Sequence, residues 1–104
     1  MSVEERTKRL TAALTQHGVP ENLHHGLALW LTHGIRPGSF LCAVLRNDLR
    51  ESFAQADLSS RFAMFDLVCA LHSDMPGGAW GSADAMAHWT KTGGLVGLYE
   101  AADG

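Results

Sequence analysis

Apolar residues recur at helical spacing along most of this chain. Within residues 20–34 they follow the i, i+4, i+7, i+8 pattern of a single buried helix face, at Leu23, Leu27, Trp30 and Leu31. Comparable patterns run through the two segments that follow, and no segment sustains the period-two alternation of a strand. The pattern therefore predicts an all-α fold.

Capping residues and glycine stops divide the chain into predicted helices. Ser2 is a candidate N-cap and Gly18 a stop for the first helix, while Ser82 is a candidate N-cap for the last. With the glycine and proline punctuation between them, five helices are predicted, at residues 2–18, 20–34, 39–57, 57–75 and 82–92.

The length of 104 residues is that of one domain. We expect residues 1–104 to form a compact single-domain bundle of about five short helices. Residues 1–18 are predicted to be an outer helix because their apolar stripe is thin, and residues 95–104 a partly ordered tail of small and acidic residues.

The stretch "HGIRPGSF" interrupts two helical patterns. Gly34 suits a helix C-terminus, where a left-handed conformation is common. Pro37 and Gly38 fit the two central positions of a type II turn, with a positive φ at Gly38, and Ser39 can cap the next helix. We expect a sharp turn that folds the third helix back on the second.

The hydrophobic core is expected to centre on residues 57–75, because apolar residues there cover more than one helix face. The third helix, 39–57, is expected to bury a stripe that extends to Leu49 and Phe53. Trp89 is predicted to be a core residue of the fifth helix.

The charge balance argues against nucleic acid as the default partner. Eight basic residues against eleven acidic ones give a net charge of -3. Acidic residues are interleaved with the basic cluster, which favours a mixed solvated face over a phosphate-binding patch. The cluster consists of Arg36, Arg46, Arg50 and Arg61 with Asp48, Glu51 and Asp57.

No signal peptide or membrane-spanning apolar run is apparent in the sequence, so we expect a cytoplasmic protein that does not bind a membrane. The two cysteines, Cys42 and Cys69, each lie in an apolar run, which is typical of reduced, buried thiols rather than of a disulfide framework.

Six histidines are unusual for this length, yet they do not form a metal-binding pattern. There is no His-x-x-x-His or Cys-x-x-Cys spacing. His17, His33 and His72 fall in the last turns of predicted helices, where a protonated imidazole complements the helix dipole. We therefore predict no metal site, no catalytic residue, no cofactor and no enzymatic activity.

Two polar or aromatic positions are candidates for recognition. Asp48 falls in the middle of the third predicted helix, beside its buried stripe, where it would accept hydrogen bonds from a neighbouring helix N-terminus, from Arg36 or from the loop around Trp80. A carboxylate that locks the fold is favoured over a ligand contact. Trp80, flanked by glycines, is either a lid on the core or an interface anchor.

Two segments, "HGIRPGSFLCAVLRNDL" and "WGSADAMAHWTKTGG", carry a resemblance. Together they resemble a family of small helical proteins of unassigned function that are encoded by tailed phages and prophages. The resemblance covers about Val19 to Gly94 and departs from the family pattern in "CALHSDMPGGAW", where the relatives have an aromatic-rich segment. It implies a small accessory protein in the host bacterial cytoplasm.

On this basis we expect a non-enzymatic protein that binds and modulates a host or phage protein, for example in host takeover or defence evasion. The predicted partner-binding residues are Arg36, Pro37, Gly38, Arg46, Asp48 and Trp80.

Three alternatives remain. Residues 20–55 could form a helix-turn-helix of a nucleic-acid-associated regulator that presents Arg46 and Arg50. A small metal-binding protein or enzyme is the second. A homodimer is compatible with the need to cover the first helix and the apolar tail residues Leu95, Val96 and Leu98.

Overall fold

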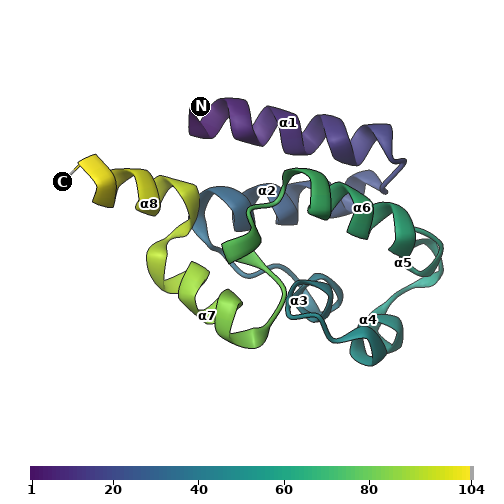
Figure 1. The fold of residues 1–104 in the computed structure, drawn as a ribbon. Helices are drawn as coiled ribbons and strands as arrows, with labels where there is room; N and C mark the ends of the chain where they lie inside the picture. The colour runs from purple at the N-terminus through teal and green to yellow at the C-terminus, as the bar shows by residue number, and fades with distance from the viewer. Residues whose placement is uncertain (104) are drawn as a thin grey trace.

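The computed structural model describes residues 1–103, and within them all regular secondary structure is helical, with no strand. The predicted all-α class is confirmed, but eight α-helices are present in this range rather than about five (Figure 1). They are α1 (Val3–Gln16), α2 (His24–His33), α3 (Ser39–Leu45), α4 (Leu49–Gln55), α5 (Leu58–Phe62), α6 (Met64–Asp74), α7 (Ala83–Thr92) and α8 (Gly94–Asp103), with short 3-10 turns at Glu21–Leu23 and Gly77–Ala79.

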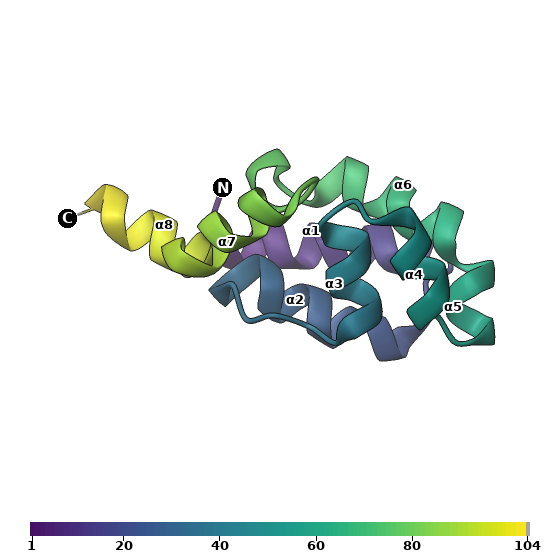
Figure 2. The same cartoon turned by 90° about the horizontal axis from the view of Figure 1, so that it is seen from below.

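The helices pack in layers around α2. Helix α1 lies along α2 and α6 on one side, and α3 and α4 lie together on the other (Figures 1 and 2). Helix α8 packs against α2. The radius of gyration of 13.0 Å is that expected of a single domain of this length. None of the helices in the described range has the length and apolar character needed to cross a membrane.

The predicted caps and stops are confirmed at both ends of the fold. The Ser2 hydroxyl accepts a hydrogen bond from the backbone N–H of Glu5, and Ser82 does the same for Ala85 at the start of α7. Helix α2 ends at Gly34, whose φ of 68° is left-handed as predicted.

Two tryptophans form the centre of the molecule. Trp30 is fully buried, and its indole N–H donates to the Ala79 carbonyl at 3.0 Å. The indole N–H of Trp89 donates to the Trp30 carbonyl at 2.7 Å. These bonds satisfy both buried indoles and tie α2, α7 and the Gly77–Ala79 turn together, so the prediction that Trp89 is a core residue is confirmed.

The predicted type II turn is wrong. Gly38 has φ −66° and ψ 175°, and it occupies the N-cap position of α3 that was assigned to Ser39. The segment between Gly34 and Ser39 has no helical or turn geometry. Because a proline disfavours helical backbone in the residue before it, Pro37 extends this link instead of closing it into a tight turn.

The third predicted helix is two helices. It breaks at Asn47, which has a left-handed φ of 66°, and α4 then starts from Asp48 as its N-cap. Asparagine tolerates this conformation better than most residues do. The break changes the direction of the chain, and it leaves Leu49 and Phe53 exposed although the helical spacing predicted them to be buried.

The fourth predicted helix is also divided, at Ala63, into α5 and α6. One side of α6 packs into the core, where Leu67 and Leu71 are fully buried. The other side faces outward, and Phe65 is 78% exposed. Helix α6 therefore contributes only one of its faces to the core, whereas more than one face was expected to be buried.

The segment predicted to be a partly ordered tail, residues 95–104, forms α8 as far as Asp103, and Gly104 lies outside the described residues. Leu95 is buried at the start of this helix, and the Tyr99 hydroxyl donates to the Met1 carbonyl at 3.1 Å. Glycines allow the close approach of α2 and α8, since a Cβ on Gly94 would lie 2.5 Å from the backbone of Thr32 and His33.

Candidate protein-binding surface

The most unusual surface of the molecule is an exposed set of large apolar side chains on α4, α5 and α6. Phe62 is 80% exposed and Phe65 78%, and Leu49 and Leu58 are each more than two-thirds exposed. Single exposed apolar residues are normal on proteins, but a group on adjacent helices is not. We call this surface the apolar face, and it consists of Leu49, Phe53, Leu58, Phe62, Phe65 and Val68.

A groove of about 280 Å³ runs across the apolar face between α4 and α6. Leu58 and Phe62 do not line the groove; they lie four residues apart on one side of α5, the helix that directly precedes α6 in the chain. Apolar side chains and one thiol line the groove, namely Leu49, Phe53, Met64, Phe65, Val68 and Cys69.

Two aspartates fix the short helices that carry the face. Asp48 caps α4 by accepting a hydrogen bond from the Glu51 backbone N–H at 3.1 Å. Asp57 caps α5 by accepting from the Ser60 backbone N–H at 2.8 Å and from the Ser59 hydroxyl at 3.1 Å. The backbone hydrogen bond from Ser60, helped by hydroxyl hydrogen bonds, holds the pKa of Asp57 below its usual value.

Three of the predicted partner-binding residues lie beside the apolar face. Asp48 and Trp80 line a small cavity of about 70 Å³ that shares Leu49 and Val68 with the face. Trp80 is half-buried and packs against the core, as the lid interpretation predicts. Arg46 forms an ion pair with Asp48 at 3.6 Å.

The carboxylate of Asp48 thus serves the fold, as favoured, although its helix begins at Asp48 instead of continuing through it. Of the partners predicted for it, the structure provides a helix N-terminus, that of α4. The Trp80 loop approaches the same place through a hydrogen bond from the Gly81 N–H to the Leu45 carbonyl at 2.7 Å.

The other three predicted residues lie elsewhere. Pro37 and Gly38 line a separate cavity of about 380 Å³ at the start of α3, whose lining shares no residue with the groove. Arg36 is exposed on the link before them. The predicted partner-binding residues therefore fall at two separate sites, one at each end of α3.

None of the six residues of the apolar face is among the partner-binding residues predicted from the sequence. Leu49, Phe53, Phe62 and Phe65 have the spacing of buried residues, and helical periodicity does not distinguish a buried stripe from an exposed one. A usable signal was the "ND" pair at Asn47, because an asparagine followed by a capping aspartate is typical of a helix end and restart.

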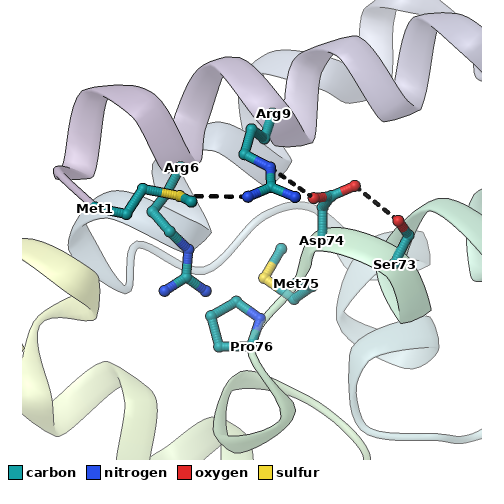
Figure 3. Close-up of a pocket in the computed structure, with 7 residues that line it drawn as sticks. All are labelled: Met1, Arg6, Arg9, Ser73, Asp74, Met75 and Pro76. Carbon is teal, nitrogen blue, oxygen red and sulfur yellow. Dashed lines mark hydrogen bonds and ion pairs between the residues drawn. The ribbon is translucent and has the colours of Figure 1, made fainter.

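A polar cavity of about 360 Å³ lies between α1 and the end of α6 (Figure 3). Arg6 and Arg9 extend from α1 toward Asp74 and Pro76 in this view. Arg9 pairs with Asp74 at 3.8 Å and donates to the Met1 sulfur at 3.7 Å. The cavity mixes basic, acidic and apolar groups, and its polar contacts join α1 to α6.

The three histidines predicted to lie at helix C-termini do so. His17 is the C-cap of α1, and His33 and His72 lie in the last turns of α2 and α6. Within residues 1–103, no group of three histidine, cysteine, aspartate or glutamate side chains is placed to hold a metal ion.

Both cysteines are unpaired thiols and half-buried, less buried than predicted. The Cys42 thiol donates to the Pro37 carbonyl at 3.2 Å, whereas Cys69 lines the groove.

Comparisons of the chain with known protein families, with curated proteins and with solved structures find no match. The resemblance to phage-encoded proteins therefore stays a prediction, and functional inference depends on the chain's own surface.

Proposed function

We propose that this chain is a small non-enzymatic accessory protein of a phage or prophage, and that it binds a host or phage protein through the apolar face. One observation supports the proposal above all others. Six of the nine large apolar side chains that are exposed within residues 1–103 lie on α4, α5 and α6, and four of the six line one groove. Apolar surface of this kind is typical of protein-binding sites.

The surroundings of the face suit a protein partner. The half-buried Trp80 and the charged pair of Arg46 and Asp48 border it, which gives an apolar centre with a polar edge. Aromatic residues, phenylalanine among them, and arginine are enriched at protein interfaces. Phe62 and Phe65 are therefore the expected anchors.

No observation favours the helix-turn-helix alternative over this proposal. Helix α3, which would have to enter a DNA groove, has seven residues, and Leu41, Val44 and Leu45 on it are buried. Arg46 is already paired with Asp48.

The test is affinity capture from a bacterial lysate, with the native chain and two variants as baits. We expect the native chain to retain a specific protein that the Phe62→Ser, Phe65→Ser double variant does not retain. Ile35→Ser is the matched control, because Ile35 is an exposed apolar residue outside the face. The purified partner should bind the double variant at least 30-fold more weakly, as expected when two anchors are lost.

Equal retention by the double variant and the native chain would contradict the proposal. So would tight, salt-sensitive binding to DNA in an electrophoretic shift assay without any protein partner.

A further inference from the structure

The apolar face is large enough to form one half of a stable dimer. We propose that, in the absence of a target, it pairs with the same face of a second copy of this chain, and that a target protein binds by displacing that copy. The inference rests on the proposed function, because it names the first occupant of the same face.

The exposed area supports this occupant. From their exposed fractions, the three phenylalanines present about 400 Å² between them, since one phenylalanine can bury about 200 Å². With the aliphatic members the face reaches roughly 600 Å² of apolar side chain. A standard interface buries about 800 Å² on each partner, including its polar edge. The apolar side chains of the face alone would therefore supply about three-quarters of one partner's share of a standard interface.

The chemistry of the face also suits an identical partner. A two-fold interface brings the same patch of both copies together, so the patch must complement itself. This one contains projecting side chains, with Phe62 the most exposed, and a groove of about 280 Å³ that can receive them. None of the described residues that line the groove is charged, so two copies meet there without like-charge repulsion.

Other exposed apolar residues do not form a comparable surface. Ile35 and Leu98 are partly exposed on separate elements, the α2–α3 link and α8. Leu95, which the sequence placed among residues in need of cover, is buried within its own chain. The apolar surface available for self-association is thus on α4, α5 and α6.

Sedimentation equilibrium of the full chain over a wide concentration range tests the proposal. We expect the mass to rise with concentration from that of the 11.2 kDa monomer to twice that value. The Phe62→Ser, Phe65→Ser double variant should stay monomeric, with a dissociation constant raised at least 30-fold, while Ile35→Ser should dimerise like the native chain. Far-UV circular dichroism verifies that the variants are folded.

A second measurement uses the native chain alone, so it does not depend on the folding of any variant. Cys69 lines the groove, whereas Cys42, on α3, donates a hydrogen bond to the Pro37 carbonyl and does not line the groove. Alkylation followed by mass spectrometry should show that Cys69 becomes less reactive as the protein concentration rises, while Cys42 keeps a constant rate.

A chain that stays monomeric at every concentration would overturn the dimer and leave the proposed function intact, because the face would be open to its target. A dimer that persists in the double variant, with Cys69 still reactive, would also overturn it. If the chain dimerises through the face but the double variant still captures its target, the dimer is supported and the proposed function fails.

Discussion

The tryptophan centre and the apolar face both consist of large apolar side chains, but the fold places them in opposite environments. Trp30 on α2 and Trp89 on α7 are buried, and each donates its indole N–H to a carbonyl. Phe62 and Phe65 project from α5 and α6 and are mostly exposed. The same type of residue stabilises the fold in one region and is left uncovered in the other.

The free energy that covering the apolar face would release is large compared with the stability of a domain. Covering the apolar face would contribute on the order of 10 kcal/mol before the costs of association, at about 25 cal/mol per Å² of apolar surface. The whole net stability of a domain is about 5–15 kcal/mol. An uncovered surface of this size is therefore a strong argument for binding, whereas the centre needs no partner.

The largest effect should come from the centre. Trp30→Ala removes a fully buried indole and leaves the Ala79 carbonyl without its donor, so we expect a loss of about 3–5 kcal/mol of stability, measured by urea unfolding. Trp30→Phe, which keeps a ring in the core, should lose less. If Trp30→Ala costs under about 1 kcal/mol, the centre does not carry the stability assigned to it.

The next effect tests the close approach of α2 and α8 beside the centre. Gly94 has a φ of 67°, and an alanine Cβ there would meet the backbone of Thr32 and His33 at 2.5 Å. Gly94→Ala should therefore cost about 2–4 kcal/mol. Gly78→Ala is the control, because a Cβ at Gly78 meets nothing within 4 Å, and its stability should change by less than about 1 kcal/mol.

Trp80 lies at the boundary between the two regions. It is half-buried against the core and shares a cavity with Leu49 and Val68 of the apolar face. Trp80→Ala should cost about 2 kcal/mol, roughly half of what a fully buried tryptophan loses. A loss below about 0.5 kcal/mol in thermal unfolding, combined with loss of partner capture, would assign it wholly to the binding surface.

Substitutions in the apolar face itself should change the stability of the monomer only slightly. Phe62→Ser should change it by less than about 0.5 kcal/mol when measured in dilute solution, since the side chain is 80% exposed. Leu67→Ala, on the buried side of neighbouring α6, should cost about 2–5 kcal/mol. Similar losses for the two variants would mean that Phe62 is part of the fold.

The smallest effect concerns the Asp57 cap of α5. Its pKa is lowered in the folded state, so its ionised form stabilises the helix above its unfolded pKa, and that contribution is lost as the pH falls through the folded value. The stability difference between the native chain and Asp57→Ala should therefore be constant near neutral pH and shrink in acid. A difference that grows in acid would contradict the cap.

The sequence predicted those parts of the fold that local chemistry decides. Ser2 and Ser82 cap helices because their hydroxyls can satisfy free backbone N–H groups, and Gly34 ends a helix because it adopts a positive φ easily. Leu27 and Trp30 are buried because their spacing leaves them on one face.

The rest depended on tertiary packing. The breaks at Asn47 and Ala63 fall inside uninterrupted helical periodicity, and neither position has a glycine or proline beside it. Once the chain turns at those points, Phe53 and Phe62 face solvent although their spacing is unchanged. For the apolar face, the helical spacing showed where the large apolar residues lie. It could not show which side of each helix stays exposed to solvent.

The contact between Tyr99 and Met1 places the start of α1 and the helix α8 at the same end of the molecule, away from α5 (Figure 1). An affinity tag or a biotin attached at either terminus would therefore project from the end remote from Leu58 and Phe62. Immobilised in this way on a biosensor chip, the protein would present its phenylalanines to the solution in one defined orientation.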